Sequence, residues 1–220
     1  MAKTAFRTRR GTSFQARALR PAQMANRAKL LISIVNRGDD ERLTELLNDF
    51  SVALTFSCMG MGTARSAVLN YLGIGTSEKA VMLSLIPESD EEDILREIEN
   101  KMSLYLVGRG ISFTVPLSAV SQIVANGITG AANEKYVDGR KIMTDKERAY
   151  DLIVVAVAEG YVDEAMEAAR KAGAAGGTVI RARSLGNAKA EQFVGISIQE
   201  ECEMLLILSK REGKAAIMQA

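Results

Sequence analysis

The sequence has no histidine and no tryptophan, and only two cysteines and three prolines among its 220 residues. Without histidine it lacks the usual general base at neutral pH, the Ser/His and Cys/His nucleophile pairs, and the commonest ligand of transition metals. Two cysteines are too few for a disulfide scaffold or a zinc cluster, and both Cys58 and Cys202 lie in apolar segments. We therefore expect both cysteines to be small core residues and the protein to occupy a reducing cytoplasm. Several enzyme classes are excluded, although carboxylate, lysine or cysteine chemistry stays open.

Long apolar runs are also missing, and none reaches the roughly 18 residues that cross a bilayer. Aromatic residues make up only 5% of the chain, and its net charge is +1. Because the excess of basic residues is confined to the N-terminal segment, the sequence does not predict a nucleic-acid-binding domain. We expect residues 1–28 to be a disordered basic extension, while an arm for nucleic acid or an acidic surface and a transit-like leader remain alternatives.

What the sequence does contain is an internal repeat. A shift of 122 residues lays one half on the other and gives ten identities over the 57 positions 30–86. Average composition gives roughly three or four such matches. The identities include Leu30 with Leu152, Gly38 with Gly160, Met82 with Met204 and Leu83 with Leu205. Apolar and polar positions coincide along the whole alignment, which indicates two similar units.

Both units show the same alternation of strand and helix patterns. Apolar runs at 30–35 and 152–158 predict buried strands, and apolar residues spaced i, i+3, i+4, i+7 from 43 and from 162 predict helices. Segments rich in β-branched residues predict further strands at 52–59, 80–86, 177–183 and 202–208. Ser89 and Glu92 have the spacing of a capping box ahead of a second helix, and residues 212–220 predict its counterpart.

The predicted fold class is α+β, with two tandem ferredoxin-like units. A strand at 111–115 completes the first unit as βαββαβ, whereas the second lacks its last strand. We assign residues 29–125 to the first domain, 126–150 to a connection rich in glycine and charge, and 151–220 to the second domain. Either the sequence is truncated at Ala220 or another segment fills the open edge of the second sheet.

Three segments resemble PII nitrogen regulatory proteins. Residues 173–186, GAAGGTVIRARSLG, resemble the stretch that runs into the base of their T-loop, and residues 193–208 resemble the strand that returns from it. Residues 108–116, GRGISFTVP, are similar to their B-loop and the strand after it. The resemblance covers about 29–122 and 151–220. It implies a tandem PII-like regulator of nitrogen metabolism rather than an enzyme, acting through a partner protein and assembling as a homo-oligomer, with three subunits in that family.

The resemblance also implies a ligand site. It places Gly60, Gly62 and Gly186 at the base of the T-loops, and Gly108, Arg109 and Gly110 in the B-loop. In PII proteins these loops come from neighbouring subunits and hold ATP or ADP, with 2-oxoglutarate bound nearby. Glycines suit this task because they let backbone N–H groups approach phosphate oxygens closely. The cofactor is left open, ATP or ADP is the expected ligand, and no metal site is predicted.

The sequence departs from the family at two places. Ile111 stands where PII proteins usually carry a phosphate-binding lysine, so one charge-assisted bond to phosphate is missing. The segments between Gly62 and Tyr71 and at 187–192 are shorter than a T-loop, which argues against regulation by uridylylation. The alternative is a degenerate relative of PII and CutA proteins that serves as an oligomeric scaffold without a nucleotide site.

Overall fold

The computed structural model describes residues 28–52, 54–62, 78–106, 108–121, 124, 149–185 and 201–220. The predicted N-terminal extension, apart from residue 28, and Gly186 lie outside these residues, as does nearly all of the predicted connection 126–150. Within the described part of the chain, no helix combines the length and the apolar character needed to cross a bilayer.

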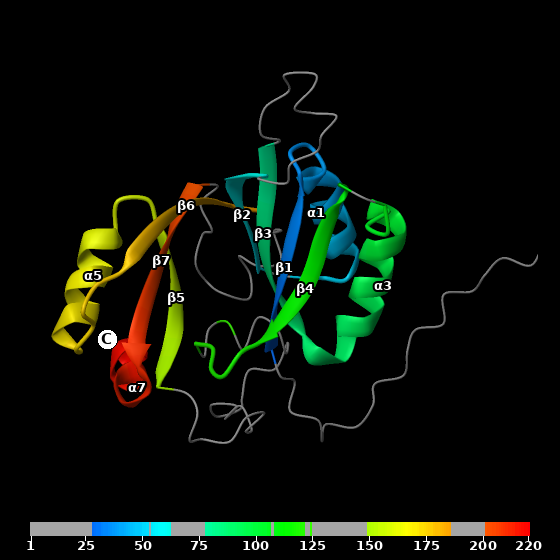
Figure 1. Cartoon of the computed structure of the whole chain (residues 1–220). Helices are drawn as coiled ribbons and strands as arrows, with labels where there is room; N and C mark the ends of the chain where they lie inside the picture. The colour runs from blue at the N-terminus through cyan, green and yellow to red at the C-terminus, as the bar shows by residue number, and fades with distance from the viewer. Residues whose placement is uncertain are drawn as a thin grey trace, which may run out of the picture.

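The first half has the element order and strand order of a ferredoxin-like unit. Its strands are arranged β4-β1-β3-β2, and each pair of neighbours is antiparallel (Figure 1). The elements are β1 (Ala28–Asn36), α1 (Asp40–Asp49), β2 (Leu54–Met61), β3 (Glu78–Pro87), a short 3-10 turn η1 (Glu88–Asp90), α3 (Glu91–Met102) and β4 (Gly110–Pro116). The predicted helix and strands of this half are therefore found close to their expected bounds.

The second half repeats the first six of these elements in the same order, with its strands arranged β6-β7-β5. The elements are β5 (Tyr150–Ala158), α5 (Val162–Lys171), β6 (Thr178–Ser184), β7 (Glu201–Lys210), a 3-10 turn η2 (Arg211–Gly213) and α7 (Lys214–Gln219). Among the described residues, β5 has a strand neighbour on one side only. None of the described strands therefore takes the position beside β5 that β4 takes beside β1.

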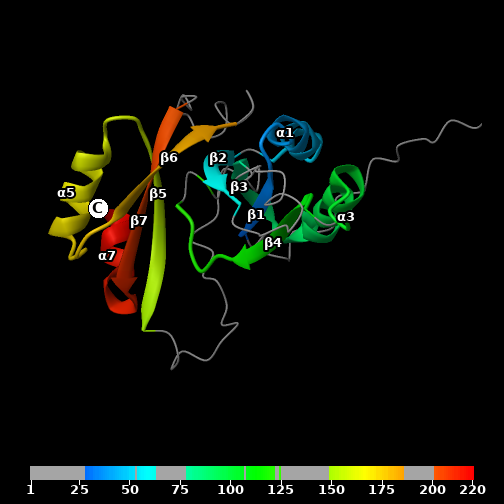
Figure 2. The ribbon, with the colours of Figure 1, turned by 45° about the horizontal axis from the view of Figure 1, so that its top comes forward.

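The two halves share one seven-stranded sheet, in the order β4-β1-β3-β2-β6-β7-β5. The junction is the antiparallel pair β2 and β6, in which Phe56 faces Ser184 and Ser57 faces Arg183. The Leu185 N–H also donates to the Thr55 carbonyl oxygen at 2.8 Å. Figure 2 shows α1 and α3 on one side of the molecule and α5 and α7 on the other, with the strands between them.

Helices cover one face of each half because alternate strand residues and one stripe of each helix are apolar. In the first half the fully buried core combines β1, β3, α1 and α3, with Leu31, Val35, Leu43, Met82 and Ile98 among its members. In the second half the corresponding core is smaller. It joins β5, β7, α5 and α7 through Ile153, Met166, Leu205, Ile207 and Ile217.

The opposite face of the sheet is apolar but carries no helix among the described elements. Met204, Cys58 and Cys202 belong to a third buried cluster here, which spans the junction between the halves. The two cysteines are therefore small core residues, as the sequence predicts. Away from the junction, apolar side chains of this open face are exposed, for example Ile111 at 55% and Leu152 at 60%.

The structure corrects the ungapped alignment of the halves. The shift of 122 holds for β1 and β5, because Leu31 and Ile153 both pack in the cores under the helices. By this shift Ile34, which faces Val81, is equivalent to Ala156, which faces Met204. Val81 therefore corresponds to Met204, a shift of 123. Met82 packs under the helices whereas Met204 lies in the junction cluster, so the predicted matches in this strand are off by one. A one-residue slip moves every side chain of a strand to the other face.

The predicted capping box is also wrong. The helix α3 begins at Glu91 with Asp90 as its N-cap, and no side-chain hydrogen bond caps this end of the helix. Ser89 lies in the turn η1 and its hydroxyl donates instead to the neighbouring Asp90 carboxylate at 2.9 Å. Three acidic residues in the first turn, Glu91, Glu92 and Asp93, favour this helix start through its dipole.

Candidate anion-binding site

Gly60 and Gly62 lie at the end of β2. Gly60 is paired with Lys79 of β3, and Gly62 directly follows the strand and is partly exposed. A Cβ at Gly60 would meet the Val81 Cγ2 atom at 3.2 Å, so a larger residue would crowd the neighbouring strand. Glycine at position 60 is therefore needed for packing, whether or not this position also faces a ligand.

Gly108, Arg109 and Gly110 lead into β4. Gly108 has a φ of +82° and open space around it, and Arg109 is exposed, with its backbone N–H donating to the Leu106 carbonyl oxygen at 3.3 Å. Gly110 has a φ of +148°, and a Cβ there would lie 2.4 Å from the Ile34 carbonyl oxygen. Gly110 is thus required for the close approach of β4 to β1.

The register of the strands places both glycine segments at the same end of the sheet. Gly110 faces Val35 on β1, Val35 faces Ala80 on β3, and Ala80 faces Met59, the neighbour of Gly60. Strands β1 and β3 lie between them, so three strand spacings separate the segments by about 14 Å. One phosphate group cannot touch both segments of the same chain, because hydrogen bonds span only about 3 Å.

Polar side chains occupy the strand ends between the two segments. The Lys79 ammonium donates to the Asn36 Oδ1 atom at 2.5 Å, and Arg37 forms an ion pair with Glu78 at 2.5 Å. Since Lys79 is paired with both Gly60 and Asn36, alternation of the strands places these three residues on the open face. Lys79 is therefore the cation adjacent to Gly60, and sequence reasoning missed it because its position depends on strand register.

The matching end of the second half differs in charge. The Gly160 N–H donates to the Glu203 carboxylate at 3.1 Å, and Glu203 and Glu201 face Arg181 and Arg183 across the strand pair. A carboxylate of the chain itself thus occupies a backbone donor that an anion would need. The predicted site residue of this half, Gly186, lies outside the described residues.

The cysteine thiols do not add reactive chemistry to this face. Burial raises the pKa of the Cys58 thiol, and the nearby Cys202 raises it further. The pKa of Cys202 is raised by burial and by the charge of Glu203. A thiol becomes a nucleophile or a metal ligand as the thiolate, so these shifts act against both roles. Among the described residues, no group of three or more cysteine, aspartate or glutamate side chains could hold a metal ion.

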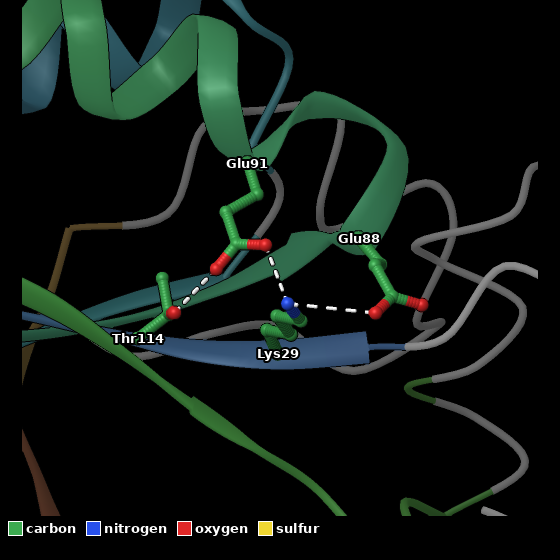
Figure 3. A network of polar contacts seen from close by, with 4 residues as sticks. All are labelled: Lys29, Glu88, Glu91 and Thr114. Carbon is green, nitrogen blue, oxygen red and sulfur yellow. Dashed lines mark hydrogen bonds and ion pairs between the residues drawn. The ribbon is translucent and has the colours of Figure 1, made fainter. Parts of the chain in front are cut away.

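A separate polar network ties β1, β4 and α3 together at the opposite end of the sheet (Figure 3). The Lys29 ammonium contacts the Glu91 carboxylate and lies 3.4 Å from Glu88, while the Thr114 hydroxyl donates to the other oxygen of Glu91. The hydrogen bond to Glu91 raises the pKa of Lys29. Burial acts to raise the pKa of Glu91, but the bonds from Lys29 and Thr114 outweigh it and lower that pKa. This network stabilises the fold and lies away from the glycine segments.

Comparisons with known proteins give structural neighbours but no relative in sequence. No family model matches the chain, and no curated protein matches it significantly. A PII protein from Arabidopsis thaliana bound to citrate matches with a TM-score of 0.36 and 13% identity, over 45% of this chain and 85% of the other. The neighbours include a PII protein.

Two further solved structures are similar at the same level. A protein of unknown function from Pediococcus pentosaceus gives a TM-score of 0.31 and 18% identity, over 44% of this chain and 97% of its own. A Bacillus cereus protein related to NIF3 gives 0.33 and 12%, over 81% of this chain and 39% of its own. All three TM-scores lie below 0.5, so none of these similarities carries information on the activity of this chain.

Proposed function

We propose that this chain is a tandem PII-like regulatory protein that binds an adenine nucleotide or another small anion and acts through a partner protein rather than by catalysis. The supporting observation is the corner of the first half where the glycine-bearing ends of β2 and β4 lie at one end of the sheet with Lys79 next to Gly60. Backbone amides at glycines and a lysine ammonium are groups that bind phosphate.

The two glycine segments of one chain lie about 14 Å apart, which favours a site built between subunits. In such a site Gly60, Gly62 and Lys79 of one unit face Gly108 and Arg109 of another, so a homo-oligomer, with three subunits as the expected form, completes the pocket. Lys79 supplies the cation that Ile111 does not. Gly110 holds β4 against β1 and supports the loop without touching the ligand.

A thermal-shift titration of the full chain with ATP, ADP, AMP and 2-oxoglutarate tests this proposal. A ligand at a hundredfold its dissociation constant stabilises the folded state by about 2.7 kcal/mol. We expect such a shift with ATP or ADP, and a reduced shift in Lys79→Gln and Arg109→Gln. Lys171→Gln is the matched control, because Lys171 is 75% exposed on α5, in the other half of the sheet. No shift with any of the four ligands would rule out the nucleotide site.

The second candidate is an oligomeric scaffold without a nucleotide site. It is favoured by the exposed apolar side chains on the open face of β4, Ile111, Phe113 and Val115. In such a scaffold, the only function of this face would be to bury these side chains between subunits. A stable oligomer that shows no thermal shift with any of the four ligands is the result that this candidate predicts.

A further inference from the structure

The outer edge of β5 is open and lacks the residues that usually protect an edge strand. Its nine residues, YDLIVVAVA, are paired with β7 on one side, and no described strand lies on the other (Figure 1). Edge strands are normally protected by lysine, proline or bulges. This edge has one charged residue, Asp151, and it exposes Leu152 and Val154 on the open face. Such an edge favours the addition of another strand.

The first half shows how the equivalent edge is filled. Strand β1 corresponds to β5 by the shift of 122, and its outer edge carries β4 in antiparallel register. Phe113 and Val115 of β4 face Ile32 and Leu30, and Thr114 faces Leu31. The same register on β5 puts an apolar residue opposite Val154, another opposite Leu152, and a hydroxyl residue opposite Ile153.

Each half has an ion pair between the strand and the helix at equivalent positions, but the acidic and basic residues are exchanged. In the first half a lysine of the strand, Lys29, meets the first residue of the helix, Glu91. In the second half the strand residue is Asp151 and the first helical residue is Lys214, with 3.7 Å between the Oδ2 and Nζ atoms.

Only in the first of these ion pairs does the carboxylate also accept a hydrogen bond from a hydroxyl among the described residues. The Thr114 hydroxyl of β4 bonds Glu91, whereas the buried Oδ2 atom of Asp151 has no hydrogen-bond partner within the described residues. A buried carboxylate oxygen without a donor is costly. The Lys214 ammonium also donates to the Ser118 hydroxyl at 3.1 Å, so the basic member of this ion pair has a hydroxyl partner from the segment that follows β4.

We propose that the outer edge of β5 binds an extended segment of a partner protein as an antiparallel strand. The segment carries apolar residues opposite Leu152 and Val154 and, between them, a serine or threonine whose hydroxyl donates to Asp151. Main-chain hydrogen bonds supply affinity, and the alternating side chains supply selectivity. This site is separate from the nucleotide corner and does not depend on it.

A partner strand fits this edge better than a second copy of β5 does. Antiparallel pairing of two β5 strands about Val154 would set Asp151 against Val157, and no residue on that face of β5 has a side-chain donor for the Asp151 Oδ2 atom. The outer edge of β4 is a weaker candidate. Its hydroxyls are already engaged, Thr114 with Glu91 and Ser112 with Ser33.

The experiment uses the full chain and a fluorescent peptide that copies residues 109–117, RGISFTVPL, because β4 is the natural model for the missing strand. We expect saturable binding by fluorescence anisotropy. A peptide with valine in place of its threonine should bind about tenfold more weakly, as for loss of a hydrogen bond to a charged group. Asp151→Asn in the protein should reduce this difference between the two peptides, because a neutral amide oxygen accepts a weaker hydrogen bond than a carboxylate does.

Two protein variants locate the binding. Val154→Lys should weaken binding at least about tenfold, since it places a charge against the apolar strand. Val179→Lys is the control, because Val179 is exposed to a similar extent, 43% against 47%, and lies on β6. Circular dichroism confirms that each variant remains folded.

Several results would overturn the proposal. These are the absence of saturable binding at millimolar peptide, equal affinity of the two peptides, or binding that Val154→Lys leaves unchanged. Sedimentation of the full chain as an oligomer that Val154→Lys dissociates would assign this edge to a second copy instead. Peptide binding by a protein that shows no thermal shift with nucleotides would support the docking edge and reject the nucleotide site.

Discussion

Two residues at the ends of helices illustrate how single positions set local conformation. Ser51, which follows α1, and Gly173, which follows α5, correspond by the shift of 122, and both have a positive φ, 58° and 101°. In each case the next residue donates its N–H back to the helix, Val52 to Leu47 and Ala174 to Ala169. Serine bears a steric cost in this left-handed conformation that glycine avoids.

Ser51→Gly should therefore stabilise the protein. The relief of strain exceeds the added freedom of the unfolded chain, and we expect a net gain of about 0.5 to 1 kcal/mol. Urea unfolding of the two proteins measures the difference. The reverse change, Gly173→Ser, serves as the companion variant and should destabilise. A loss of stability in Ser51→Gly would contradict the assigned backbone conformation.

Glu91 gives stability a defined dependence on pH. Its pKa is lowered in the folded state from the ordinary value of 4.5, so its contribution is present above that value and is lost as the pH falls through the folded pKa. Glu91→Gln should cost about 1 kcal/mol at pH 7, and its deficit relative to the wild type should shrink at pH values below 4.5. Urea unfolding across this range measures both quantities.

The control for this prediction is Glu97→Gln. Glu97 pairs with Lys101 at 3.0 Å on the surface of α3, where its side chain is 39% exposed against 20% for Glu91. Exposed ion pairs contribute little, so this variant should be nearly neutral at both pH values. An equal deficit in the two variants would show that burial of Glu91 does not matter.

At the scale of elements, the sequence predicted what depends on local patterns. The helix α1 was predicted from its apolar periodicity and the strand β1 from its apolar run, both of which the sequence shows directly, and β4 was predicted as the strand that closes the first unit. The capping box failed because Ser89 has the right spacing but lies in a 3-10 turn that precedes the helix. The face of β7 was assigned wrongly because one extra residue before it reverses the alternation, and an ungapped alignment cannot detect this.

The candidate site was predictable only in part, for a similar reason. Glycine segments are visible in the sequence, and their position at one end of the sheet follows from the ferredoxin-like strand order. The role of Gly110 in packing against Ile34 and the placement of Lys79 next to Gly60 depend on strand register. Arg109→Gln and Lys79→Gln are therefore better probes of ligand binding than a substitution at Gly110, which would disturb β4.

At the scale of the whole molecule, the junction of the two halves is short. Among the described residues, two residue pairs join β2 to β6, and a buried cluster of Cys58, Ala182, Cys202 and Met204 packs over them. The sequence predicted two units but not their common sheet, because pairing between units depends on long-range contacts. The cluster, rather than the strand pairing, is expected to couple the halves.

Met204→Ala tests this coupling. Removing a side chain that is 1% exposed should cost about 2 to 4 kcal/mol. In calorimetry we expect a single transition for the wild type and a broadened or split one for Met204→Ala, because the halves of the variant unfold more independently. Met59→Ala is the control: Met59 is 60% exposed and its loss should change stability by less than about 0.5 kcal/mol. A sharp, unshifted transition in Met204→Ala would show that the halves are held together by other contacts.

The common sheet limits how this protein can be divided. Separating the halves in the 126–150 region would leave β2 without β6 and would expose Met204 and its apolar neighbours to water. Each fragment would then expose an apolar surface and an unpaired strand edge, so poor solubility of either fragment alone would be a result of the cut itself. Mixing the two fragments during refolding should recover soluble material that neither yields by itself.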